Sequence, residues 1–115
     1  MIDLSDELRE AVASVRARVR QGYPWWLRFF LMRGVIGITL GRRIYVAPHL
    51  AGRQLERLLR HELAHVGQVA RHGLFTFYWR YLTEYVSHRR AGLSSVAAYR
   101  AISFEKEALA AEETV

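Results

Sequence analysis

The stretch from Gly52 to Arg71 places the strongest constraint on the fold, because it predicts a long helix that must be largely buried. Five apolar side chains make most of its middle part apolar: Leu58, Leu59, Leu63, Ala64 and Val66. Gly73 follows shortly after, at a position where a residue of positive φ commonly ends a helix. The same helix carries His61, Glu62 and His65, and burial of such polar groups is costly unless they have partners.

His61 and His65 lie four positions apart, so on a helix they project from one face and can bind one metal ion through neutral ring nitrogens. Glu62 is rotated about 100° from His61 on such a helix. It therefore flanks the pair, where a general base should lie to take a proton from metal-bound water. Chance occurrence of H-E-x-x-H on a surface helix is the alternative, with a probability of about 2% for this composition.

A catalytic zinc ion needs a third protein ligand, and the chain has no cysteine, so that ligand must be His, Asp or Glu. His72 shares the helical face of the two histidines but lies about 10 Å beyond His65 along the axis. If one helix runs through AYRAISFEKEALAAE (98–112), Glu105 lies on its inward stripe and Glu107 on the opposite side. We therefore expect Glu105 to be the third ligand. A new helix capped by Ser103 would weaken this argument. The alternative is that Glu105 is an ordinary glutamate exposed to solvent.

The segments before the long helix predict a mainly helical α+β domain with a small hairpin packed beside that helix. Apolar residues at spacings of three and four predict a first amphipathic helix: Leu4, Leu8, Val12, Val15 and Val19. A short aromatic helix, WWLRFFLMR (25–33), is expected next. Two β-branched runs, VIGITL (35–40) and RIYVA (43–47), predict the hairpin, with Gly41 at the first position of a type II′ turn.

Two more helical segments are predicted after the long helix. LFTFYWRYLTEYVSHRR (74–90) has the pattern of a third long helix. Ser94 or Ser95 can cap a last helical stretch that runs toward Glu113. Because no linker or repeat interrupts the sequence, we expect residues 1–115 to form a single domain.

The net charge of +6 comes almost entirely from arginine, and such a basic surface can attract nucleic acid or an anionic membrane. The arginines are scattered through every segment without a nucleic-acid-binding motif, so we expect no specific nucleic-acid partner. PWWLRFFLMR (24–33) could anchor the chain at a membrane surface, although burial is the commoner fate of such a segment. Without a signal-peptide pattern or a membrane-spanning run, a cytoplasmic location is the default expectation.

The motifs HELAH (61–65) and FEKEA (104–108) together resemble those of the gluzincin clan of zinc metallopeptidases. In that clan H-E-x-x-H supplies two zinc ligands, and a glutamate on a later helix, often in an E-x-x-A motif, supplies the third. Glu105 and Ala108 match this motif. Over about residues 35–110 the chain also resembles short bacterial proteins regarded as metallopeptidases, through its H-E-L-x-H-x-x-Q helix and its AYR…FE.EA tail.

The resemblance implies that His61, His65 and Glu105 hold Zn²⁺ and that Glu62 is the general base of peptide-bond hydrolysis. It also implies that an exposed edge of the hairpin pairs with an extended substrate. A donor to the oxyanion is needed as well, and four residues are candidates, with Tyr99 preferred: Tyr99, Arg100, His72 and His88.

One position departs from the family pattern. Many gluzincins follow E-x-x-A with an aspartate that orients a ligand histidine, and here that position is Leu109. A backbone carbonyl or another acid, such as Glu84, must then orient the histidine.

The leading hypothesis for function is a zinc-dependent metallopeptidase that acts on a peptide or protein substrate. A catalytically idle zinc-binding module and a membrane-surface-associated adaptor are the alternatives. Glu62 is not needed merely to hold zinc, so its presence favours the enzyme.

Overall fold

Five helices and a three-stranded sheet make up the part of the chain that the computed structural model describes, residues 4–26 and 37–112. In chain order the elements are α1 (Asp6–Ser14), β1 (Arg18–Gln21), β2 (Gly37–Leu40), β3 (Arg43–Val46), α2 (Gly52–His72), α3 (Leu74–Arg90), α4 (Ser95–Ala101) and α5 (Ser103–Ala111). This confirms the α+β class with a predominance of helix. None of the described helices combines the length and the apolar character that a membrane span requires.

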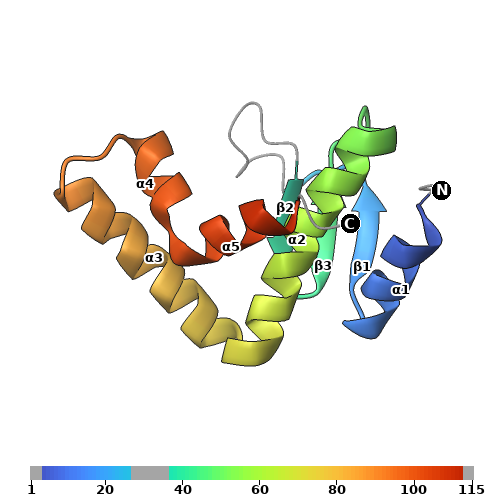
Figure 1. Cartoon of the computed structure of the whole chain (residues 1–115), viewed down its shortest axis with the longest axis horizontal. Helices are drawn as coiled ribbons and strands as arrows, with labels where there is room; N and C mark the ends of the chain where they lie inside the picture. The colour runs from blue at the N-terminus through green and yellow to red at the C-terminus, as the bar shows by residue number, and fades with distance from the viewer. Residues whose placement is uncertain (1–3, 27–36, 113–115) are drawn as a thin grey trace.

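Helix α2 lies between the sheet and α5, and α3 leads away from its C-terminal end (Figure 1). The predicted long helix is confirmed: α2 ends at His72, and Gly73 follows with a φ of 84°. Buried side chains join α2 to β3 in the main core: Ile44, Val46, Leu55, Leu59 and Val66. Because the sheet packs against one side of α2 and α5 against another, the polar side chains of α2 that point to these elements are surrounded by protein.

The sheet has β3 in the middle, paired with β2 in antiparallel and with β1 in parallel orientation. The predicted hairpin of β2 and β3 is confirmed. Its turn has a positive φ at Gly41 (64°) and none at Arg42, which is the pattern of a type II′ turn. Strand β1 was not predicted.

The first helix is shorter than predicted. It ends at Ser14, and Val19, which was expected to extend its apolar stripe, belongs instead to β1. Arg16 has a positive φ of 55°, which breaks the helix, and the Arg18 N–H then donates to a carbonyl of the hairpin turn at 2.8 Å. Val19 fits the alternation of a strand as well as a helical stripe, and pairing with β3 decided between the two.

The predicted C-terminal helix is in fact two helices. Ser94, one of the two predicted caps, accepts a hydrogen bond from the Ala97 N–H at the start of α4. Ile102 has an extended backbone with a ψ of 131° and separates α4 from α5. Helix α5 begins at Ser103, whose N–H and hydroxyl both donate to the Glu84 carboxylate of α3 at 2.8 Å. The expectation of one continuous helix was therefore wrong, and the alternative of a new helix at Ser103 is confirmed, although Ser103 is the first residue of α5 and Ile102 is its N-cap.

The predicted aromatic helix at 25–33 falls almost entirely outside the described residues. Trp25 and Trp26 are the two of its positions that the structure describes, and their exposed fractions are 75% and 42%. Neither side chain belongs to the core.

Candidate metal centre

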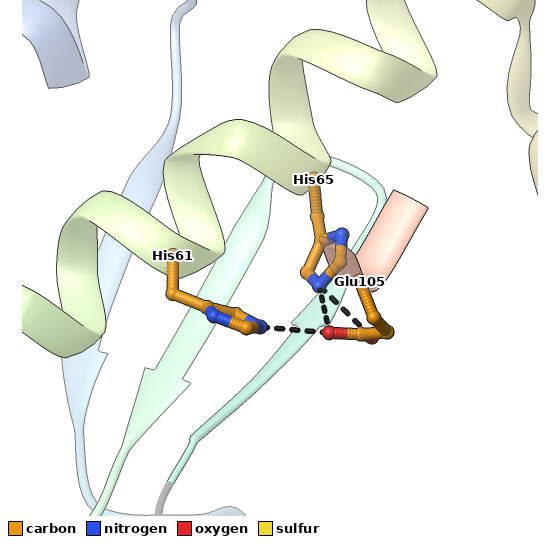
Figure 2. Close-up of side chains that lie close together, drawn as sticks. All are labelled: His61, His65 and Glu105. Atoms are coloured by element: carbon orange, nitrogen blue, oxygen red, sulfur yellow. Dashed lines mark hydrogen bonds and ion pairs between the residues drawn. The ribbon is translucent and has the colours of Figure 1, made fainter. Parts of the chain in front are cut away.

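Three side chains converge beside α2: His61 and His65 from that helix and Glu105 from the first turn of α5 (Figure 2). The Nε2 atoms of His61 and His65 lie 2.8 Å and 3.2 Å from Oε1 of Glu105. One donor atom from each residue lies within 4.8 Å of the other two. Two imidazole nitrogens and a carboxylate oxygen suit zinc and other first-row metal ions. The fold thus brings together the three residues that the sequence singles out as ligands.

His65 is oriented by Gln68, which lies nearly one turn further along α2. The amide nitrogen of Gln68 donates to the carbonyl of Phe104 at 3.0 Å and to Glu107 at 3.2 Å. Its amide oxygen is therefore the atom that lies 2.9 Å from Nδ1 of His65 and accepts from it. Nε2 is then the nitrogen that faces Glu105, and once it gives up the proton that it donates there, its lone pair is available to a metal ion.

His61 is oriented by Glu112, just beyond the last turn of α5, through a 2.9 Å contact between Nδ1 and Oε2. Although burial lowers it, hydrogen bonds to Glu105 and Glu112 raise the pKa of His61 to about 9. This partner was not expected from the sequence, although a signal was present, since Glu112 follows Glu105 by seven residues, two helical turns. Glu84, the acid suggested for this role, caps α5 instead.

Glu105 is 5% exposed, and the hydroxyl of Tyr81 donates to its Oε2 at 2.5 Å. Burial opposes its ionisation, but hydrogen bonds from the two histidines hold the pKa of Glu105 well below its usual range. Its place in the first turn of α5 also favours a negative charge, because the amide dipoles of a helix point there. Glu107, which was expected on the opposite side of the helix, is exposed and pairs with Arg71 at 2.5 Å.

Glu62 lies beside this cluster and is 5% exposed. Its Oε2 accepts a hydrogen bond from the hydroxyl of Thr39 in β2 at 2.5 Å. Burial raises the pKa of Glu62, and the Thr39 hydroxyl and the two histidines partly offset this rise. Strand β2 approaches closely because residue 37 is glycine: a Cβ there would lie 2.9 Å from Cδ1 of Leu58 and 3.2 Å from Oε1 of Glu62. Glu62 is therefore a buried carboxylate with a raised pKa, and a rise is the direction of change that a general base requires.

Tyr99, the preferred oxyanion donor, is 43% exposed and interacts with Glu105 and with the Tyr81 hydroxyl. Burial and the charge of Glu105 raise the pKa of Tyr99 above its ordinary value, so its hydroxyl stays protonated and able to donate. Within residues 4–26 and 37–112, no hydrogen bond joins the cluster to the other three candidates, Arg100, His72 and His88. The ring of His72 packs on Phe104 at 5.3 Å.

The candidate base faces an edge strand. Because β3 is paired on both sides, β2 is the strand of the hairpin whose second edge has no neighbouring strand among residues 4–26 and 37–112. Leu40 and Arg43 flank the two-residue turn as a hydrogen-bonded pair, so the backbone N–H and C=O groups of Gly37 and Thr39 point to that edge. The hydroxyl of Tyr78 donates to the carbonyl of Thr39 there, at 3.4 Å. An edge of this kind can add an extended peptide as a further strand.

Comparisons of the chain with protein families, with curated proteins and with solved structures find no match. The arrangement of the side chains is thus the ground for any assignment of function.

Proposed function

We propose that this chain is a zinc-dependent metallopeptidase with the ligand arrangement of the gluzincins. The observation that carries the proposal is the convergence of His61, His65 and Glu105 on one point, with buried Glu62 beside them. Three ligands would suffice to hold a metal ion. A fourth ionisable group, buried next to them, supports a role in hydrolysis.

The three side chains fit zinc in the spacing and in the orientation of their donor atoms. Tetrahedral zinc, with bonds of about 2.0–2.1 Å, has neighbouring donors about 3.3 Å apart. The two histidine nitrogens here are 2.8 Å and 3.2 Å from Glu105 Oε1, and the three donor atoms lie within 4.8 Å of one another, so a modest shift of the side chains would bring them to the spacing that zinc needs. Three protein ligands leave one position open, as in catalytic zinc sites. Bound zinc would supply a Lewis acid that lowers the pKa of a coordinated water toward about 7.

Glu62 would serve as the general base. Its buried carboxylate has a raised pKa, which brings it closer to the range where a group can both take and return a proton near neutral pH. The Thr39 hydroxyl holds Oε2 and so leaves Oε1 to exchange protons. Tyr99, protonated and partly exposed beside Glu105, would donate to the oxyanion that develops on the scissile group.

An extended peptide is the substrate class that this site favours. The outward N–H and C=O groups of Gly37 and Thr39 lie on the same strand that supplies the hydrogen bond to Glu62. A peptide that pairs with this edge would lie next to the general base. The backbone of the substrate would thereby be aligned whatever its side chains.

Elemental analysis of the full chain, purified without a histidine tag or chelator, tests metal binding. We expect about one zinc per chain in the wild type and much less in His65→Ala and Glu105→Ala. Glu10→Ala is the control, because Glu10 is an exposed carboxylate of α1 that lies outside the cluster and its hydrogen-bond partners. It should keep the zinc.

A peptide-library cleavage assay then compares the wild type with Glu62→Gln, which retains all three proposed ligands. Cleavage that falls by roughly 10²-fold or more in Glu62→Gln would support the proposed mechanism. Zinc binding without cleavage of any peptide would favour the idle module, and absence of zinc binding would remove the basis of the proposal.

A further inference from the structure

The outer face of the sheet, opposite α2, carries an arginine cluster made of Arg18 and Arg20 from β1 and Arg43 from β3. Side chains alternate along a strand, and Val19 and Ile44 pack in the core, so their neighbours point to the other face. Arg18 lies opposite Arg43 in the parallel register of the two strands. Arginines that are scattered in the sequence are thus gathered by a strand pairing that the sequence did not predict.

The cluster has no carboxylate partner in the part of the chain that the structure describes. None of its three side chains forms an ion pair or a hydrogen bond with a described residue. Neighbouring strands are about 4.8 Å apart, and like charges that face each other across them destabilise a sheet. The chain as a whole carries a net charge of +6. An anion bound among the arginines would relieve their repulsion.

Together with Tyr45 the cluster lines a hollow of about 270 Å³. The three arginines are exposed, whereas Tyr45 is 6% exposed, so the hollow combines a charged rim with a buried aromatic residue. This volume is several times the roughly 30 Å³ that one water molecule occupies. The hollow can therefore hold a group larger than a single solvent molecule.

We propose that this hollow binds a dianionic phosphate group, carried by a phosphomonoester or a pyrophosphate. A guanidinium group is planar and matches two phosphate oxygens at once. A phosphomonoester carries a charge of about −1.5 to −2 at pH 7, which suits three arginines better than the single charge of a diester. Small soluble molecules and certain lipid headgroups both present this group. The site faces away from the candidate metal centre and does not depend on the proposed peptidase activity.

Calorimetric titration of the full chain with pyrophosphate tests the proposal. EDTA is included so that no bound metal takes up the anion, and sodium chloride keeps the ionic strength constant. We expect saturable binding that is roughly tenfold weaker in Arg18→Gln and again in Arg43→Gln. Arg53→Gln is the charge-matched control, because Arg53 is exposed at the start of α2 and lies outside the hollow. Thermal melts confirm that each variant is folded.

Sedimentation with phosphatidylcholine vesicles identifies the source of the phosphate group. A lipid headgroup is indicated if the wild type sediments with vesicles that contain phosphatidic acid but not with vesicles that contain the same fraction of phosphatidylglycerol. Arg18→Gln should then no longer sediment with the phosphatidic acid vesicles. Absence of retention, with pyrophosphate bound, indicates a small soluble ligand. The proposal is overturned if pyrophosphate shows no saturable binding, or if Arg53→Gln loses as much affinity as the two cluster variants. Tight binding of single-stranded RNA that all three variants weaken equally would also overturn it.

Discussion

Gln68 accepts a hydrogen bond from His65 and donates one to the carbonyl of Phe104, the residue directly before Glu105. One fully buried side chain therefore ties a candidate ligand on α2 to the backbone that carries the candidate ligand on α5. The tautomer of His65 and the distance between the two helices are set by the same group.

Replacement of Gln68 by leucine should weaken both zinc binding and the fold. The change leaves His65 Nδ1 without its acceptor and removes the side-chain hydrogen bond to the Phe104 carbonyl, which together cost about 1–3 kcal/mol of unfolding free energy. Zinc affinity should fall by roughly 10–100-fold, as expected when an orienting partner of a ligand is lost. Competition with a chromophoric chelator and urea unfolding measure the two effects. Gln54→Leu, an exposed glutamine of the same helix, is the control, and equal behaviour of the two variants would contradict the assigned role.

The metal-free protein should lose stability as the pH rises from about 6.5 to about 9. The pKa of His61 is raised to about 9 from an ordinary value of 6.5, so the fold favours its protonated form. This contribution is complete below pH 6.5 and is lost as the pH passes through 9, with an upper bound on the order of 3 kcal/mol. Urea unfolding in EDTA at several pH values measures it. Glu112→Gln removes one of the two carboxylate partners and should reduce the fall; an identical pH profile would speak against the pairing.

Gly37→Ala should destabilise the protein by about 1–3 kcal/mol, because the new methyl group would overlap Leu58 and crowd Glu62. Gly67→Ala is the matched control: it lies within α2 with no atom within 4 Å of the added Cβ. That change should stabilise the helix by up to about 1 kcal/mol. Thermal unfolding compares the two. The double variant Gly37→Ala with Leu58→Ala should lose less stability than the sum of the two single variants, because the smaller side chain makes room for the new methyl group. Losses of stability that simply add would argue against a close approach of residue 37 to Leu58.

Glu84→Ala should destabilise α5 by about 0.5–2 kcal/mol, since the carboxylate accepts both the N–H and the hydroxyl of Ser103. Because Glu105 lies in the same first turn, zinc affinity should also fall. A double-mutant cycle with Ser103→Ala isolates the interaction. Because Ser103→Ala keeps the backbone N–H, strictly additive losses of stability would show that the hydroxyl contact contributes nothing of its own.

Local patterns predicted the elements whose contacts are local. The length of α2, its end at Gly73 and the hairpin around Gly41 each depend on residues near in sequence, and all three were predicted. Strand β1 was not, because it exists through pairing with β3, more than 20 residues away. The apolar periodicity around Val19 was compatible with both a helix and a strand. A local pattern contains no information about β3, the distant strand with which this segment pairs.

The candidate site shows the same division. His61, His65 and Glu62 were found because their relation is fixed by helix geometry. Glu105 was predicted to face inward on the assumption of a single helix, whereas the break at Ile102 divides this segment into two helices. Glu105 nevertheless faces inward, because Phe104 and Ala108 on the same face of α5 are also buried. Three partners of the cluster were missed because each depends on how another element is rotated against it: Glu112, Tyr81 and Thr39. Gln68 was also missed, although it lies on α2 itself, three positions after His65.

The separation of His61 from Glu105 by 44 positions also orders events during synthesis of the chain. A nascent chain that has emerged only through α3 already displays both histidines but lacks the third donor and the carboxylate that orients His61. Such an intermediate would bind zinc weakly, as two unrestrained imidazoles do. If the chain binds zinc as proposed, metal capture would therefore follow translation of α5, and a chain interrupted before that helix would lack a complete site.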